Sequence, residues 1–448
     1  MTRKLCSLFV LGFATLNAAD FQVTDYGAKG DGKTIDTQGI QRAIDAAAAA
    51  HGTVFFKSGV YLTGALFLKS GMKMSIGDGV TIRGVQNLAA YPEMPTRVAG
   101  IEMTWPSALV NIYRQSNVEL SGSGTIDGDG KYWWDSYWRL RKDYEPKGLR
   151  WASDYDAKRV RLIQVYDSSN VRLTGLRLER SGFWTVHLCY SHNISVDGVT
   201  IRNNIGGRGP STDGIDIDSS STVTVQQCDI ECNDDALCLK AGRDADGLRV
   251  NRPTENVTIR DCTVRDAAAG VTVGSETSGG IHDVKVSGIH VLGAVPKGIC
   301  FKSAKTRGGT VERIDIGNMD MRGVPAPVSI TANWNPSYSY AHIPPDSKSV
   351  PEYWHKLAQQ VPPEKGLPHF RNVTVSGIHA TGAKRAFEVE AYPNDPIENF
   401  TFTNIDIQAE TAGRIADAWN WVFTKTHIET KDGSHVILKD CRNVKGLP

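Results

Sequence analysis

The sequence lacks an excess of charge of either sign. Its 50 lysines and arginines are matched by 49 aspartates and glutamates, which leaves a net charge of +1. No stripe of basic residues compensates for this balance. Because nucleic acids and anionic membranes attract proteins through a positive field, we expect neither of them to be a partner.

Long apolar runs are absent beyond the N-terminus, so no later segment is expected to span a membrane. At the start, Arg3 and Lys4 precede an apolar run over 5–16 and then small residues, which is the layout of a signal peptide. A membrane anchor or a buried strand is the alternative interpretation. We expect residues 1–19 to be removed and residues 20–448 to form a single catalytic domain, periplasmic or secreted.

Cysteines are few, and their number is odd once Cys6 leaves with the signal peptide. An odd count rules out complete intramolecular pairing. Several of the remaining cysteines fall at inward positions of the repeat described below, where a free thiol acts as a small hydrophobe. Their spacings lack a partnering histidine pair, so we expect no metal and no cofactor. The seven are Cys189, Cys228, Cys232, Cys238, Cys262, Cys300 and Cys441.

Helical periodicity is scarce, whereas one pattern, apolar-x-apolar-x-x-apolar-x-apolar, recurs along the chain. Successive units start 23 to 34 residues apart, except for a step of 59 that we interpret as two units. Each unit is too small to bury its own apolar face, so the units must stack into one core. The starts are Val171, Ile194, Val223, Val257, Val284, Ile314, Val373 and Phe400.

This repeat predicts an all-β fold, a single-stranded right-handed parallel β-helix. Asn or Thr precedes the first strand of most units, and asparagine amides can hydrogen-bond along a stack of turns. An immunoglobulin-like sandwich fits less well, because its strands are more closely spaced and joined by hairpins. A helix through Ala50, capped by Asp36 or Thr37, is expected to cover the open N-terminal end of the coil.

The third strand of each unit brings carboxylates together. Aligning these strands places Asp213 and Asp235 two residues before the first inward residue of consecutive units. Equivalent positions in a parallel coil stack about 4.8 Å apart, and Asp234 is adjacent in sequence. Crowded carboxylates raise at least one pKa. Glycoside hydrolysis needs such a pair of unlike acids, although a calcium site or solvent-facing turns are the alternatives.

Other residues of this region are candidates for contact with a sugar. Lys240 and Lys302 occupy equivalent places three residues beyond the strand starts, and suit either a carboxylated sugar or simple charge balance. Trp184 stacks in register before Asp213, and either faces a sugar ring or fills the core. A Pro- and aromatic-rich excursion over 333–370 contains Trp334, and so long an interruption is typical of a functional loop.

Two motifs now identify a family resemblance. The segments Ser211-Thr212-Asp213-Gly214-Ile215-Asp216 and Asn233-Asp234-Asp235 resemble the polygalacturonase-type glycoside hydrolases of family 28, over about residues 20–430. Gly274-Ser275-Glu276 and the segment 298–302 agree with it. The resemblance implies a pectate-lyase-like β-helix and an inverting, metal-free hydrolase. It makes Asp234 the general acid, with Asp213 and Asp235 activating water. The candidate substrate-binding residues are Lys302, Lys240, Asp216, Trp184 and Trp334.

The sequence departs from the family pattern at two places beside the leaving group. The Gly-His-Gly tripeptide reads Ala268-Ala269-Gly270, and Arg-Ile-Lys reads Cys300-Phe301-Lys302. Losing the arginine clamp costs a charge-assisted contact of about 1.5–3 kcal/mol. We therefore hypothesise that the leaving sugar carries no carboxylate, as rhamnose in rhamnogalacturonan would satisfy.

Insertions at 243–252 and 333–354 are placed to wall off one end of a groove, which indicates an exo mode of attack. We expect a pectic oligo- or polysaccharide as the partner, and we expect the protein to be a monomer. The alternatives are an exo-polygalacturonase on homogalacturonan, a pectate lyase and a non-catalytic carbohydrate-binding β-helix.

Overall fold

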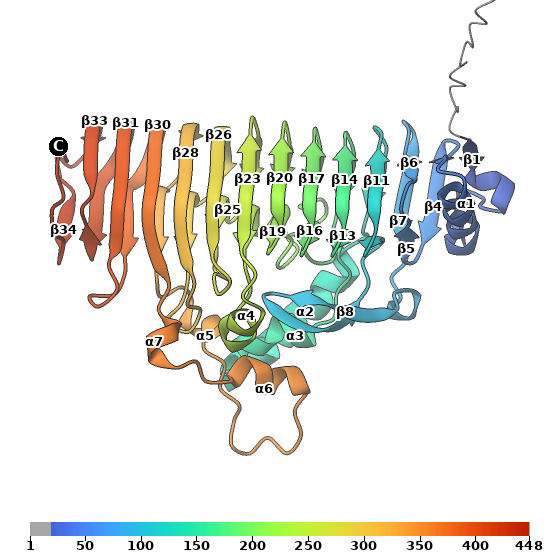
Figure 1. Ribbon diagram of the computed structural model, residues 1–448, viewed down its shortest axis with the longest axis horizontal. Coiled ribbons are helices and arrows are strands. Elements are labelled where there is room, and N and C mark those ends of the chain that lie inside the picture. The colour runs from blue at the N-terminus through green and yellow to red at the C-terminus, as the bar shows by residue number, and fades with distance from the viewer. Residues whose placement is uncertain (1–18, 448) are drawn as a thin grey trace, which may run out of the picture.

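The structure, a computed structural model, describes residues 19–447, and its chain winds into one long coil of short stacked strands (Figure 1). Strand pairing is parallel throughout the coil, and one hairpin outside it is antiparallel. The expected class, an all-β right-handed parallel β-helix, is confirmed. The predicted signal peptide lies, apart from Ala19, outside the described residues.

Each turn of the coil contributes to three parallel sheets, here called the site, back and side sheets. The site sheet consists of β5 (Leu66–Leu68), β10 (Val110–Tyr113), β13 (Ile163–Tyr166), β16 (Val186–Cys189), β19 (Ile215–Asp218), β22 (Asp235–Lys240), β25 (Ala269–Val273), β27 (Lys297–Lys302), β29 (Ala326–Thr331) and β34 (Ile437–Lys439), with the later parts of β30 (His369–Glu390) and β31 (Ile397–Ala416).

The back sheet consists of β1 (Asp20–Gln22), β3 (Thr53–Phe55), β6 (Lys73–Ser75), β11 (Ser116–Ser121), β14 (Ser169–Thr174), β17 (His192–Asp197), β20 (Ser221–Gln226), β23 (Thr254–Arg260), β26 (Ile281–Ala294), β28 (Thr310–Arg322), β30, β31, β32 (Ala418–Trp419) and β33 (Val422–Thr430). The side sheet consists of β2 (Asp31–Ile35), β4 (Gly59–Thr63), β7 (Val80–Gly84), β12 (Thr125–Asp127), β15 (Arg177–Glu179), β18 (Thr200–Arg202), β21 (Asp229–Glu231), β24 (Thr263–Asp266) and the bent continuations of β26, β28, β30, β31 and β33.

The core is a set of stacked apolar columns. Val171, Ile194, Val223 and Val257 are register partners on consecutive coils, and each is at most 2% exposed. Burying one such side chain contributes about 1.5–3 kcal/mol, so the repeated pattern both selects the register and stabilises it. The seven cysteines of the described chain are free thiols, and six of them are buried.

A ladder of asparagines marks the bend before the back sheet. Asn117, Asn170 and Asn193 all have left-handed backbone conformations, with φ between 54° and 57°. The amide of Asn170 donates to Asn117 at 3.0 Å, and that of Asn193 donates to Asn170 at 2.5 Å. Asparagine tolerates this conformation better than other non-glycine residues. The expected stacking of amides is therefore confirmed, and it recurs through Asn372, Asn399, Asn420 and Asn443.

The step of 59 residues does not contain two coils. Ile314 pairs directly with Val373, so one coil holds the whole segment and our interpretation was wrong. The extra length leaves the coil as an excursion after β29 that includes α5 (Pro336–Ser339), α6 (Glu352–Ala358) and α7 (Pro363–Gly366). A loop that leaves the coil and returns at the same edge adds residues without changing the register. For this reason the 59-residue spacing could not distinguish one coil with a long loop from two coils.

The N-terminal helix α1 (Thr37–Ala49) covers the end of the coil beside β1, as expected (Figure 1). Asp36 precedes it but makes no side-chain cap. Its carboxylate instead accepts hydrogen bonds from the backbone of Lys29 at 2.6 Å and Gly30 at 2.9 Å. The backbone of Asp36, with φ −94° and ψ 2°, is not in the extended conformation usual for a capping residue.

Inserted segments gather below the middle of the coil in Figure 1. They are the hairpin of β8 (Glu93–Val98) and β9 (Ile101–Pro106), the helices α2 (Lys131–Tyr144) and α3 (Ser153–Asp156), and α4 (Asp244–Val250) with α6. No helix in residues 19–447 is both long and apolar enough to cross a membrane. The insertions share a second apolar core with the coil, made of Val98, Ala99, Ile101, Trp105, Trp151, Ala152, Tyr155, Phe183, Trp184, Trp354 and Leu357.

The asparagine ladder generates a stability prediction. Asn193→Gly removes the side-chain hydrogen bond to Asn170, but glycine suits the positive φ at this position. This variant should lower the free energy of unfolding by about 1 kcal/mol. Asn193→Ala loses the same hydrogen bond, and its Cβ atom is also strained in the left-handed backbone conformation. The free energy of unfolding should therefore fall by about 1 kcal/mol more. Thermal unfolding followed by circular dichroism should rank the apparent Tm as wild type, then the glycine variant, then the alanine variant. Equal Tm values for the two variants would contradict a role for the backbone conformation.

Candidate active site

Three aspartates meet at the edge of the site sheet. Asp213 lies two residues before β19, and Asp235 is the first residue of β22. Because Ile215 and Leu237 are register partners, the two aspartates occupy equivalent positions on adjacent coils. One carboxylate oxygen from each of Asp213, Asp234 and Asp235 lies within 4.8 Å of the other two. The predicted cluster is thus present.

The backbone holds this cluster tightly. The amide of Gly214 donates to the Asp235 carbonyl at 2.9 Å, and the amide of Ala268 donates to the Asp234 carbonyl at 2.9 Å. A Cβ atom at Gly214 would lie 2.4 Å from the Ala236 carbonyl oxygen. Glycine after Asp213 is therefore needed for the two coils to approach each other closely.

The two adjacent acids are driven to opposite protonation states. Burial and the neighbouring Asp235 carboxylate raise the pKa of Asp234 to about 6. Burial alone would raise the pKa of Asp235 as well, but Lys302 and Lys240 outweigh it, so this pKa lies below its ordinary value. The Asp235 carboxylate accepts from Lys302 Nζ at 2.7 Å and from Thr272 Oγ1 at 3.0 Å. One acid thus retains its proton in conditions where its neighbour is ionised.

Asp213 and Asp216 form a second crowded pair. Burial, followed by the carboxylates of Asp216 and Asp234, raises the pKa of Asp213 well above its ordinary value. Burial raises the pKa of Asp216 to about 8, although Lys240 opposes the rise. Asp216 is fully buried, and it does not line the pocket that contains the three aspartates. The structure therefore places Asp216 next to Asp213 and Lys240 but outside the lining of this pocket, and its contact with a sugar stays a prediction.

The two lysines end their strands beside the acids, as predicted. Lys240 Nζ lies 3.4 Å from Asp213, 3.5 Å from Asp216 and 3.4 Å from Glu276. Lys302 Nζ is bonded to Asp235 and lies 4.4 Å from the centre of the Trp334 ring. Both lysines line the pocket, and both neutralise carboxylates of the protein itself.

Aromatic side chains close the pocket on the side of the earlier coils. Trp184 is 3% exposed, stacks on Phe183 at 5.3 Å and lies 4.9 Å below Lys240 Nζ. Phe183 in turn contacts Trp105 of the hairpin. Trp184 is therefore buried, as one interpretation has it, and it also lines the pocket, while its contact with a sugar stays a prediction. Trp334 and Tyr338 of the later excursion line the pocket too.

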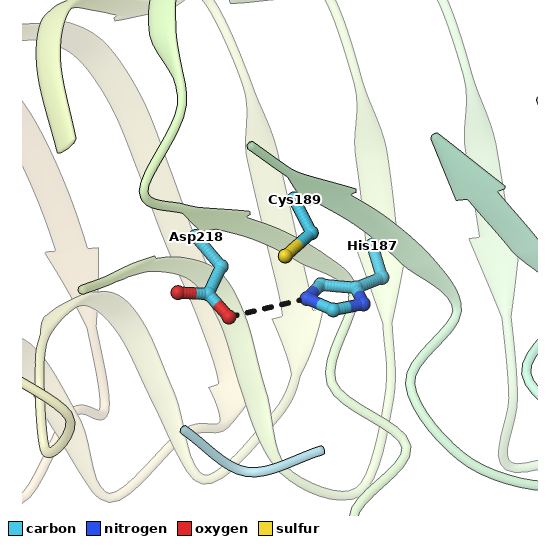
Figure 2. A group of neighbouring side chains, drawn as sticks. All are labelled: His187, Cys189 and Asp218. Carbon is cyan, nitrogen blue, oxygen red and sulfur yellow. Dashed lines mark hydrogen bonds and ion pairs between the residues drawn. The ribbon is translucent and has the colours of Figure 1, made fainter. Parts of the chain in front are cut away.

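The hairpin of β8 and β9 also covers the C-terminal end of β19. Arg97 Nη1 donates to Asp218 Oδ1 at 2.8 Å, and neither side chain is exposed. Figure 2 shows the neighbouring His187 and Cys189, with His187 Nε2 3.3 Å from Asp218 Oδ2. Burial and Arg161 lower the pKa of His187 to about 4, which keeps the imidazole neutral near pH 7. His187, left ambiguous by the sequence, thus belongs to a buried polar cluster under the hairpin, and the cation balancing Asp218 is an arginine.

Sequence reasoning did not assign Arg150 and Asp154 to the pocket, and it quoted Glu276 only as part of a motif. Arg150 Nη1 donates to Asp154 Oδ2 at 2.9 Å, and Ser211 Oγ donates to Asp154 Oδ1 at 2.7 Å. One sequence signal could have pointed to Arg150 and Asp154. Val118 and Val171 are register partners on adjacent coils, although a step of 53 residues separates them in sequence. That step marks an insertion, but not which of its residues point into the site.

The sheet continues beyond the pocket on the opposite side. A shallow apolar groove adjoins the site there, with Arg208 and Asn233 at its polar edge. It is lined by Ala267, Ala268, Gly293, Ala294, Val295, Pro296, Gly323 and Pro325. The alanine that stands where the family pattern has the first residue of Gly-His-Gly therefore contributes to an apolar surface.

Comparisons with known proteins agree with this architecture. Residues 57–344 match the family model described as glycosyl hydrolases family 28. The chain is 26% identical to a probable polygalacturonase of Vitis vinifera, over 86% of this chain and 73% of that protein. It is 24% identical to an exo-poly-alpha-D-galacturonosidase of Dickeya chrysanthemi, over 88% of this chain and 68% of that protein.

Solved structures share the fold. A hyperthermoactive exopolygalacturonase from Thermotoga maritima superposes with a TM-score of 0.71 at 25% identity, covering 95% of this chain and 93% of that one. A family 28 exopolygalacturonase from Yersinia enterocolitica superposes with a TM-score of 0.80 at 22% identity, covering 96% and 79%. The matched family model spans more than half of the chain and includes all three aspartates, so the protein belongs to glycosyl hydrolases family 28 and is a glycoside hydrolase.

Proposed function

We propose that this enzyme hydrolyses α-galacturonosyl linkages in a pectic polysaccharide, from a chain end, with rhamnogalacturonan as its substrate. The observation that carries the hydrolytic part is the trio of carboxylates with opposed pKa shifts in one buried pocket. Such a split supplies an acid and a base at the same pH. The named activities of the relatives support the pectic substrate.

In the proposed reaction, Asp234 protonates the glycosidic oxygen while water attacks the anomeric carbon. The carbon–oxygen bond to the leaving sugar breaks, and Asp235 takes the proton from the water. Asp213, whose pKa is raised, orients that water by hydrogen bonding. Lys302 keeps Asp235 ionised through its contact at 2.7 Å. All of these groups belong to the chain itself, and no metal takes part.

The stereochemical course depends on whether Asp235 acts as a base or as a nucleophile. Carboxylate oxygens within 4.8 Å of one another are closer than in most inverting enzymes and resemble the spacing of retaining ones. We nevertheless propose inversion. Both oxygens of Asp235 already accept bonds, from Lys302 and Thr272, which holds the carboxylate for proton transfer rather than for attack on carbon.

Attack from a chain end is supported by the shape of the pocket. The stacked rings of Trp184 and Phe183, with Trp105 beyond them, stand where a chain would continue toward the earlier coils. On the preceding coil, Arg161 occupies the position equivalent to Trp184 and is fully buried. This covering of the earlier coils supports the proposal that the pocket accepts the end of a chain.

The leaving-side sugar is proposed to be rhamnose. The apolar groove at Ala268 suits the methyl group of a deoxysugar, and the arginine of the family pattern is replaced by Cys300, which is 1% exposed. The second candidate is exo-polygalacturonase activity on homogalacturonan, favoured by the names of the Dickeya and Thermotoga relatives.

A pectic polymer lies outside the cell, so we propose that residues 20–448 act as a single catalytic unit after export to the periplasm or the medium. The enzyme is proposed to act as a monomer.

The opposed shifts of Asp234 and Asp235 predict the pH profile. kcat/KM should fall about tenfold per pH unit well above pH 6, because Asp234 must be protonated to act. On the acid side it should persist to below the ordinary aspartate range, because Asp235 stays ionised there. Asp234→Asn should lower kcat by about 10²- to 10⁴-fold and abolish the alkaline limb. A wild-type rate that is constant up to about pH 8 would refute the assignment of the acid.

The inverting course predicts the first anomer that appears. Proton NMR of a reaction in progress should show the β-anomer of the released sugar before mutarotation. Early appearance of the α-anomer would instead make Asp235 a nucleophile, in keeping with the short separation of the oxygens.

The proposed substrate and mode predict the products. Oligosaccharides of rhamnogalacturonan and of homogalacturonan, labelled at the reducing end, should be compared by chromatography. One small product should leave the non-reducing end of the rhamnogalacturonan substrate from the first turnover, with a chelator present and without ultraviolet-absorbing unsaturated sugars. Galacturonate release from homogalacturonan alone would overturn the rhamnose proposal. A ladder of sizes would overturn the exo mode, and unsaturated products would indicate a lyase.

A further inference from the structure

We propose that Arg150, from the insertion between β12 and β13, binds the carboxylate of the galacturonosyl unit held in the pocket, on the non-reducing side of the scissile bond. This inference rests on the proposed function, and it assigns substrate recognition to a residue outside the family motifs. Arg150 lines the same pocket as Asp213, Asp234 and Trp184.

Three cations line this pocket in the described part of the chain, and two of them are already committed. Lys302 is bonded to Asp235 at 2.7 Å and covered by Trp334. Lys240 lies between three carboxylates at 3.4 to 3.5 Å and is 5% exposed. Moving either lysine toward a substrate would leave catalytic carboxylates without their counterion.

Arg150 differs from both lysines because it has donors to spare. Only its Nη1 is bonded to a carboxylate, that of Asp154, and its buried Nε has no hydrogen-bond partner among the described residues. An arginine fork carries five N–H donors and binds carboxylates through two of them at once. The Arg150 side chain is 13% exposed and lines the pocket, so the exposed part of its fork can donate to a ligand carboxylate.

Asp154 accepts bonds from both Arg150 and Arg159, so this carboxylate is shared between two guanidinium groups and does not engage Arg150 alone. The guanidinium of Arg150 lies 5.1 Å from the ring centre of Tyr338, which holds its plane in the pocket wall.

Asp154 connects this wall to the catalytic loop. Ser211 Oγ donates to Asp154 Oδ1 at 2.7 Å, two residues before Asp213. Ser211, the first residue of the Ser211–Asp216 motif, thus links the insertion to the segment that carries Asp213. Because Arg159 and Ser211 still hold Asp154 when Arg150 is changed, the wall should keep its fold.

The test compares wild type with Arg150→Gln and Arg150→Lys on two substrates. One is an oligosaccharide with a free galacturonate at its non-reducing end, and the other carries the methyl ester of that unit. Wild type should prefer the free acid by about 10- to 150-fold in kcat/KM. Arg150→Gln should lose this preference, mainly through KM, and keep its activity on the ester within about twofold. Arg150→Lys should recover part of the preference.

The control variant is Arg139→Gln, which removes an exposed guanidinium from the same insertion and should behave as wild type. A loss of activity on acid and ester alike in Arg150→Gln would mean a structural role and overturn the inference, as would an undiminished preference for the acid.

A binding measurement separates this inference from the proposed function. Calorimetric titration with galacturonate and with galactose needs no turnover. Galacturonate should bind wild type more tightly than Arg150→Gln, and galactose should bind both equally. Weaker galacturonate binding to the variant would support the inference even if no substrate were hydrolysed, whereas equal binding would overturn it.

Discussion

The stacking of equivalent positions at a spacing of about 4.8 Å is the constraint on which the rest of this structure depends. In the core it places apolar side chains over one another, so that each coil repeats the same pattern. At the edge of the site sheet the same spacing places Asp213 and Asp235 together, although like charges repel. The free energy that holds the carboxylates close comes from core burial elsewhere in the coil.

Proximity alone does not make three aspartates useful. Their protonation states differ because the cations around them are placed unevenly. Lys302 contacts Asp235 and lowers its pKa. Asp234 is buried beside the Asp235 carboxylate, which raises its pKa, and among the described residues no cation is in bonding contact with it. The lysines are on the ends of β22 and β27, so the register that gathers the acids also decides which acid is neutralised.

The inserted segments turn a surface of the coil into a pocket. A β-helix by itself presents a long, open sheet face along which a polymer can lie. Here the second apolar core, with Trp105, Phe183 and Trp184 at its centre, blocks that face on one side of the acids. The same insertions bring Arg150 and Asp154 against the segment before Asp213 through Ser211. The aspartate cluster thus belongs to the coil, whereas the closure of the pocket comes from segments outside it.

Several features could be predicted because they depend on residues close in sequence or on a regular period. The repeat predicted the coil, the paired motifs predicted the cluster of acids, and asparagines at the bends predicted their ladder. The offset of Lys240 and Lys302 from the strand starts predicted their place beside the acids. In each case, a constant register converts sequence distance directly into spatial distance.

This relation does not hold for the insertions. A loop that leaves the coil and returns has no fixed register with the neighbouring coils, so sequence distance does not predict where its residues lie. The 59-residue step was therefore misinterpreted as two coils. Asp216 is a different case, because it lies in β19 of the regular coil but is fully buried and does not line the pocket. Arg150 and Asp234 are distant in sequence, and only packing of the second core brings them into one pocket. The sequence by itself determined the coil and its acids, through local periodicity. The tertiary structure alone decided the pocket around them, because its walls are built from non-periodic contacts between distant segments.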